Sequence, residues 1–237
     1  RFKRLIFVSQ YQFQTYHMAL GIPYSEATIL RNAIEPIPEH KKEKSDTINL
    51  IYHTTPHRGL ELLIPVVDFL INKGKKIHLD VYSSFEMYGW ANRDEPYQKV
   101  FDKIKASDNM TYHGYKPNDV VRKALQKAHI FAYPNIWPET SCIALLEALS
   151  AGCTVVHPNY GALPEASSNF GVLYGWEEDP NKHANKFCQI LDAVIDDYWS
   201  KSNQQKLSVQ KKYIDIFYNW DMRMIEWKAL LNSLQPQ

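Results

Sequence analysis

The chain has 237 residues, of which 45% are hydrophobic and 22% are charged, as is typical of a folded globular protein with a sizeable core. Lys and Arg total 27 against 26 Asp and Glu, and the net charge of +1 gives no overall attraction for nucleic acid, so we expect no nucleic-acid partner. Charged residues interrupt the apolar runs before the roughly 20 residues that a membrane-spanning helix needs, which favours a soluble protein. The three cysteines form no Cys-x-x-Cys pair, a pattern that favours free thiols and a cytoplasmic location.

The first 45 residues are too few to form a domain. They are predicted to contain, in chain order, a buried strand over 3–9, a helix over 10–21 closed by Gly21, and a short strand within 27–38 that runs into a proline-punctuated loop. The charged stretch 40–46 has no apolar periodicity and is the best linker candidate in the chain. We place a domain boundary near Ser45.

Residues 46–198 alternate between strand and helix patterns. Strands are predicted over 48–53, 76–83, 110–114, 129–134, 154–158 and 171–175, and helices over 58–74, 95–106, 117–128 and 141–152. Most of these strands are unbroken apolar runs, which is typical of strands covered by helices on both faces. The pattern predicts an α/β domain with a doubly wound, mostly parallel, Rossmann-like sheet. From residue 179 the chain is predicted to be helical to its end, with a last amphipathic helix over 219–234.

In such a sheet, ligands bind at the carboxyl ends of the strands, near helix N-termini. The loop HTTPHRGLE follows the strand 48–53 and places Arg58 and Gly59 at the start of the next helix. Backbone N–H groups and a guanidinium could meet a phosphate there. The alternative is a solvent-exposed arginine that follows the turn-forming Pro56.

The loop PNIWPETSC carries more information, because it leaves the central strand 129–134 and opens the helix 141–152. Glu147 is the only charged residue of that apolar helix, so its carboxylate must be either paired or turned away from the core. Glu139 lies eight positions earlier, just before the helix. The structural alternative makes Glu139 a capping residue and Glu147 an exposed helix position.

The segment PNIWPETSCIALLEALSAGCTVVHPNYGALPE, over 134–165, resembles the donor-site signature of retaining GT-B glycosyltransferases, especially glycosyltransferase family 4. RGLELL, the segment 112–134, NAIEPI and NWDMRMIEWKALL also resemble parts of that family. The resemblance covers nearly the whole chain and implies the C-terminal, donor-binding lobe of a GT-B fold. Residues 1–45 would be the tail of an N-terminal lobe with its linker, 46–198 the nucleotide-sugar-binding domain, and 199–237 helices that pack back toward the N-terminal lobe.

The resemblance implies transfer of a hexosyl group from a UDP- or GDP-sugar with retention of configuration. Glu147 would accept hydrogen bonds from the ribose hydroxyls, and Glu139 would hold hydroxyls of the donor sugar. Arg58 would neutralise the diphosphate as the leaving group develops charge, which is a role that needs no metal.

The remaining implied contacts come from small groups around the donor. Backbone N–H groups at Ser141, Cys142 and Ile143 would face the diphosphate or the sugar, with Gly59 in the glycine-containing basic loop. Tyr115 occupies the position where the family commonly places the base. No cofactor is implied besides the nucleotide-sugar substrate. The chain contains no Asp-x-Asp sequence, and no metal site is expected.

The chain departs from the family pattern in two ways. The family usually has a second basic residue several positions before the one matched to Arg58, where this chain offers His53 or His57. A zinc site on these two histidines is not expected, because Pro56 lies between them and no acidic or cysteine partner follows at metal-site spacing. The second departure is that only the tail of an N-terminal lobe is present. The acceptor, whether a glycan, a lipid-linked group or a protein, would bind through that missing lobe, and the full-length protein could associate peripherally with a membrane.

Several residues keep two interpretations. Cys142 is either a nucleophile activated at a helix N-terminus or a small residue needed for close packing, and its match to a small-residue position of the family signature favours close packing. Gly161 and Glu165 either flank the donor or serve as a turn glycine and a helix cap. Two other functions also stay open for the whole chain: a lobe of a sugar-nucleotide epimerase, which would need more catalytic carboxylates and histidines around the donor, and a non-catalytic nucleotide-sugar-binding module.

Overall fold

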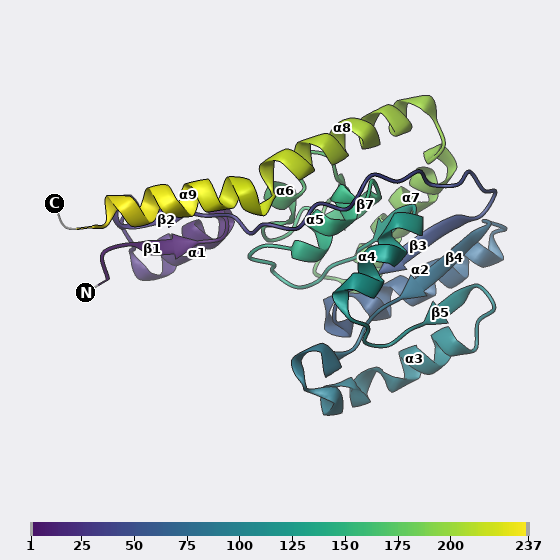
Figure 1. Ribbon diagram of the computed structural model, residues 1–237. Helices are drawn as coiled ribbons and strands as arrows, with labels where there is room; N and C mark the ends of the chain where they lie inside the picture. The colour runs from purple at the N-terminus through teal and green to yellow at the C-terminus, as the bar shows by residue number, and fades with distance from the viewer. Residues whose placement is uncertain (1, 236–237) are drawn as a thin grey trace.

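The computed structural model describes residues 2–235 and is built around a six-stranded parallel sheet (Figure 1). Its strands lie in the order β5-β4-β3-β6-β7-β8, and every neighbouring pair is parallel. The strands are β3 (Ile48–Tyr52), β4 (Ile77–Val81), β5 (Met110–Tyr112), β6 (Ile130–Ala132), β7 (Thr154–Pro158) and β8 (Val172–Tyr174). All residues of β6 and β7 are buried, as expected for central strands covered on both faces.

The helices lie in two layers around this sheet. The chain runs outward from β3 to β4 and β5, then crosses back to β6 and continues outward to β7 and β8. Right-handed crossovers therefore place α2 and α3 on one face of the sheet and α4 and α5 on the other. Accordingly α2 packs against α3 and α7, while α5 packs against α4 and α8. This arrangement confirms the predicted doubly wound sheet. The helices are α2 (Leu60–Asn72), α3 (Gln98–Lys105), α4 (Asn118–Lys127), α5 (Ile143–Ser150), α6 (Leu163–Ala166), α7 (Pro180–Asp197) and α8 (Lys201–Phe217).

The N-terminal segment forms a second, two-stranded parallel sheet from β1 (Leu5–Phe7) and β2 (Ala27–Ile29), joined by α1 (Gln10–Leu20). Ser9 caps the start of α1, and Gly21 ends it in the left-handed conformation, as the sequence predicts. The chain then crosses to the large sheet through residues 30–47. This crossing is held to the large domain, because the Lys42 ammonium is half-buried and donates to the carbonyls of Leu125 and Ala128 at the end of α4.

Four parts of the structure differ from the sequence predictions. The strand predicted to be buried over 3–9 covers only Leu5–Phe7, and Ile6 is 40% exposed because this strand lies in the small two-stranded sheet outside the main core. The helix predicted over 95–106 begins later, at Gln98, because Pro96 lies in a 3₁₀ segment over Ala91–Tyr97. The short helix α6 was not predicted. The last helix, α9 (Trp220–Ser233), is not the predicted amphipathic helix, since Arg223 is its only buried residue and Trp220, Met224, Ile225 and Leu231 are exposed.

This last correction follows from where α9 lies. Asn219 pairs with Ile34 at its start, and Lys3 donates to the carbonyl of Leu234 at its end, so α9 runs along the N-terminal unit away from the large sheet (Figure 1). Because α9 lies away from the main core, its large apolar side chains stay exposed. Within residues 2–235, no helix combines the length and the apolar content needed to cross a membrane.

Candidate functional site

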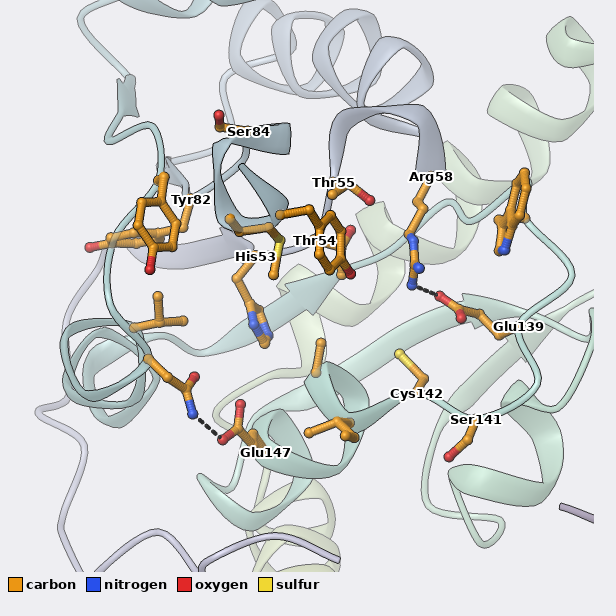
Figure 2. Close-up of a pocket in the computed structure, with 18 of the residues that line it drawn as sticks. His53, Thr54, Thr55, Arg58, Tyr82, Ser84, Glu139, Ser141, Cys142 and Glu147 are labelled. Carbon is orange, nitrogen blue, oxygen red and sulfur yellow. Dashed lines mark hydrogen bonds and ion pairs between the residues drawn. The ribbon is translucent and has the colours of Figure 1, made fainter. Parts of the chain in front are cut away.

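A pocket of about 610 Å³ opens at the carboxyl ends of the central strands (Figure 2). The strand order reverses between β3 and β6, and the loops that leave these two strands both line the pocket. Seven of the eight residues predicted for the site lie in its wall: Arg58, Tyr115, Glu139, Ser141, Cys142, Ile143 and Glu147. The eighth, Gly59, does not line the pocket.

Glu139 is buried beside Arg58. Its side chain forms an ion pair with the Arg58 guanidinium, and its Oε1 accepts a hydrogen bond of 2.7 Å from the Tyr133 hydroxyl. Only 4% of Glu139 is exposed, and this burial raises the pKa of its carboxyl group, against the opposing effect of Arg58. The helix N-cap is Cys142, so the interpretation of Glu139 as a capping residue is wrong.

Burial and the ion pair with Glu139 also shift the pKa of Arg58. Burial lowers the pKa of Arg58, but Glu139, Tyr133 and Cys142 together outweigh that effect, and the net pKa lies above its usual value. Two sequence-predicted charges, 81 residues apart, therefore neutralise each other in the wall of the pocket.

Glu147 is 6% exposed and is held by two residues of α4, so the interpretation of Glu147 as an exposed helix position is also wrong. Asn118 Nδ2 and Arg122 NH1 both contact Glu147 Oε1, at 3.0 and 3.1 Å. Arg122 also donates to the carbonyls of Glu35 and Pro36 in the crossing segment. Within residues 2–235, no hydrogen bond uses Oε2 of Glu147, so this oxygen is available to a ligand.

Gly59 has a positional role. Its φ angle is +109°, and a Cβ atom there would lie 2.1 Å from the Pro134 carbonyl oxygen. Only glycine lets the loop after β3 approach the loop after β6 this closely. Gly59 thereby brings Arg58 within reach of Glu139. Gly161 does the same on the other side, because a Cβ atom there would lie 2.7 Å from both the nitrogen and the oxygen of the Glu139 backbone.

The two histidines of the β3–α2 loop differ in position. His53 lines the pocket, and burial lowers its pKa to about 3, so it is neutral at ordinary pH. His57 lies outside the pocket wall, stacked on Phe85 at 5.2 Å between ring centres, and burial lowers its pKa to about 4. Neither supplies a second cation. Arg58 and Lys116 are the Lys and Arg residues in the pocket wall.

The start of α5 presents backbone donors to the pocket. Ser141 and Cys142 make no hydrogen bond through their backbone N–H groups among residues 2–235, and Ile143 opens the helix, where N–H groups have no partner within the helix. The Ser141 hydroxyl accepts a bond of 3.0 Å from Asn32. Burial, followed by the nearby Glu139, raises the pKa of the Cys142 thiol to about 12, so the interpretation of Cys142 as an activated nucleophile is wrong.

Glu165 lies away from the pocket. It accepts hydrogen bonds from the backbone N–H groups of Gln10 and Tyr11 and pairs with Arg31, so it caps the start of α1 and ties the N-terminal unit to the large domain. Among residues 2–235, no group of three or more His, Cys, Asp or Glu side chains is arranged to hold a metal ion.

Sequence reasoning missed the residues that hold the two glutamates. Tyr133 supports Glu139, and Asn118 with Arg122 supports Glu147. One signal was available, because Asn118 and Arg122 are four residues apart and share a face of the predicted helix 117–128. Nothing in the spacing shows that this face meets Glu147.

Comparison with known proteins defines the class. The fold is that of the Rossmann-like lobe of GT-B glycosyltransferases: a solved glycosyltransferase from Rickettsia africae superposes with a TM-score of 0.78 at 12% identity, over 96% of this chain and 62% of that one. The Anabaena HepE protein, solved in complex with UDP and glucose, superposes with a TM-score of 0.74 at 16% identity, over 98% of this chain and 64% of that one.

The family follows from the sequence. The family described as Glycosyl transferases group 1 matches residues 33–212, so the chain belongs to this family. The phosphatidylinositol N-acetylglucosaminyltransferase gpi3 subunit of Schizosaccharomyces pombe is 22% identical over 186 residues, which are 78% of this chain and 38% of that protein. The O-antigen chain mannosyltransferase B of Escherichia coli is 29% identical over 111 residues, which are 47% of this chain and 27% of that protein. The chain thus spans less than half the length of these curated relatives.

Proposed function

We propose that the pocket binds a nucleotide-sugar donor and that the protein transfers its sugar to an acceptor with retention of configuration, as in glycosyltransferase family 4. The observation that carries the proposal is the pair of buried carboxylates, Glu139 and Glu147, in one pocket wall. Protein groups engage Oε1 of each carboxylate, and within residues 2–235 no hydrogen bond uses either Oε2. Two buried acceptors are therefore available for the hydroxyls of a ligand.

Each part of a donor has a matching group in the wall. Glu147 accepts the ribose hydroxyls, Glu139 accepts hydroxyls of the sugar, and the base lies toward Tyr115, which is partly exposed at the rim. The donor in this proposal is a UDP- or GDP-sugar. The two carboxylates and one histidine of the wall do not favour the epimerase alternative, which needs more acid and base groups around the donor.

The diphosphate is the leaving group of the transfer. As the bond between the sugar and the diphosphate breaks, a bond from the acceptor oxygen to the sugar forms, and the acceptor hydroxyl passes its proton to the departing diphosphate oxygen. Arg58 and the free N–H groups at the start of α5 stabilise the charge that develops on the diphosphate. In this proposal no metal is needed, and the acceptor is a glycan, a lipid-linked group or a protein. The protein works in the cytoplasm and attaches peripherally to a membrane.

Calorimetric titration with UDP, GDP and their sugar conjugates tests the proposal. Glu147→Gln should weaken binding of the diphosphate roughly tenfold or more, because a hydrogen bond to a charged acceptor typically contributes about 1.5–3 kcal/mol. Glu139→Gln should leave the free diphosphate bound and remove the added affinity of the sugar. Glu178→Gln, at an exposed position, is the control. If both pocket variants bound every ligand as the wild type does, the assignment would fail.

Retention has its own test. When the donor UDP-α-glucose is hydrolysed slowly by the enzyme, proton NMR of the first released sugar should show α-glucose. Initial release of the β anomer would contradict a retaining mechanism.

A further inference from the structure

A second cavity, of about 360 Å³, lies at the amino-terminal edge of the large sheet, opposite the edge that carries the donor pocket. Its walls come from residues 39–42 of the crossing segment, from the turn at Ala151 and Gly152 that precedes β7, and from residues between 198 and 212 at the start of and along α8. The crossing segment runs beside α8 here, where Lys211 Nζ donates to the Ile37 carbonyl at 2.5 Å (Figure 1). No residue lines both cavities, so a ligand here would occupy a separate site.

The wall of this second cavity is positively charged. Lys41, Lys42, Lys211 and Lys212 line it, whereas Glu39 is its one acidic lining residue in the part of the chain that the structure describes. The whole chain has a net charge of only +1, so these lysines are a local concentration of charge. Lys41 and Lys212 are exposed, and among residues 2–235 neither ammonium has a hydrogen-bond or ion-pair partner. Two cations from different segments are therefore available at the rim.

The two inner lysines are fixed in position. Lys42 Nζ donates to two backbone carbonyls at the end of α4, and Lys211 Nζ donates to two others and pairs with Asp215 at 2.8 Å. Burial lowers the pKa of Lys42, and the charge of Lys211 acts in the same direction while Cys153 opposes both. The single carboxylate of Asp215 thus leaves positive charge at the inner end of the cavity, where an anion would be stabilised.

Tyr198 contributes a donor that the protein does not use. It lines the cavity and is 1% exposed, and its hydroxyl has no hydrogen-bond partner among residues 2–235. Burial raises the pKa of Tyr198, so the hydroxyl keeps its proton and can donate. The hydroxyl interacts with Cys153, whose Sγ lies 3.6 Å from Lys42 Nζ, so the donor and the inner cation lie at the same end of the cavity. A buried polar group without a partner is uncommon, and a ligand that accepts from it removes its cost.

We propose that this second cavity binds a small molecule through a phosphate group, with Lys41 and Lys212 at the rim and the Tyr198 hydroxyl at the inner end. A phosphate fits better than a carboxylate, because the donors come from several directions and a phosphate offers three oxygens and up to two negative charges. Lysine ammonium groups suit such a ligand as point charges. The inference is independent of the proposed function, since the two cavities share no residue.

Calorimetric titration with inorganic phosphate and with glycerol 3-phosphate tests the inference, with glycerol as the ligand that lacks the phosphate. Both phosphates should bind the wild type, and glycerol should not. The double variant Lys41→Gln, Lys212→Gln should lose roughly 5- to 30-fold in affinity for both, because two partly exposed charges are removed. Tyr198→Phe keeps the ring and removes only the hydroxyl, so it should lose roughly tenfold or more while its melting temperature without ligand is unchanged or higher.

The double variant Lys44→Gln, Lys201→Gln is the matched control. Both lysines are exposed and lie on the crossing segment and on α8, but neither lines the cavity, so this variant should bind as the wild type does. The inference is overturned if the wild type binds neither phosphate, or if the control loses as much affinity as the rim variant. It is also overturned if the rim variant binds weakly and Tyr198→Phe binds normally, because the lysines would then act only as surface charge. None of these outcomes bears on the binding of UDP or GDP in the donor pocket.

Discussion

Arg58→Met removes one of the two paired charges in the pocket wall and leaves the other, Glu139, in place. The substitution leaves the Glu139 carboxylate, which is 4% exposed, with the neutral Tyr133 hydroxyl as its remaining partner. Breaking a buried ion pair from one side typically costs about 3–5 kcal/mol, because the surviving charge stays buried without compensation. We expect a loss of this size in the free energy of unfolding at pH 8, measured by urea denaturation.

The pH dependence of this loss identifies its cause. Burial already raises the pKa of Glu139, and removing Arg58 takes away the larger of the two groups that oppose this shift, the other being the Tyr133 hydroxyl. A carboxyl group whose pKa is higher in the folded than in the unfolded protein binds its proton more tightly when folded, so its contribution to stability falls as the pH rises. The difference between variant and wild type should therefore shrink at lower pH, by up to about 1.4 kcal/mol per pH unit below the new pKa.

The double variant Arg58→Met, Glu139→Gln should recover most of the lost stability, because no charge is then left unpaired. Arg93→Met, at an exposed position, is the control and should change stability little. The reasoning is refuted if Arg58→Met is as stable as the wild type at pH 8. It is equally refuted if the loss is the same at every pH and persists in the double variant.

Three further predictions concern the fold and the ligand. Gly59→Ala should destabilise the protein in urea by at least about 2 kcal/mol more than Gly74→Ala. Both glycines have a positive φ, but of the two only Gly59 would place a Cβ atom against the Pro134 carbonyl oxygen, so equal losses would rule out this contact as the cause. Burial lowers the pKa of His129 and of His157 to about 4, so both are neutral in the folded protein and stability should fall as the pH drops from about 6.5 toward 4. The expected loss is about 2 kcal/mol per histidine at pH 5, and a melting temperature unchanged between pH 7 and pH 5 would contradict this. Binding of a nucleoside diphosphate should survive EDTA, and recovery only on adding magnesium or manganese would show that a metal neutralises the diphosphate.

The sheet could be predicted from the sequence because its signals are local. Unbroken apolar runs such as those of β6 and β7, separated by amphipathic helices, require a parallel sheet covered on both faces, and the positions of the loops at its carboxyl edge follow from topology. This reasoning placed the two loops at one edge of the sheet, and the family resemblance implied that Arg58, Glu139 and Glu147 share one site there.

The interactions within the pocket could not be predicted, because they depend on distances between segments far apart in the chain. The sequence alone does not show that Arg58 pairs with Glu139, or that Arg122 crosses from α4 to Glu147. At Cys142 local reasoning left two interpretations, and burial, which raises the pKa of the thiol, excludes the activated nucleophile. The prediction of an amphipathic α9 was wrong for a related reason, since periodicity cannot show whether a core lies beside a helix.

A structure of this chain with UDP or GDP bound tests the central claim most directly. The account predicts that the nucleotide occupies the pocket between the β3–α2 loop and α5, with a ribose hydroxyl within about 2.6–3.2 Å of a Glu147 carboxylate oxygen. The diphosphate should lie beside Arg58 and the N-terminus of α5. A nucleotide bound elsewhere on the protein, or bound in this pocket with its ribose away from Glu147, would contradict the account.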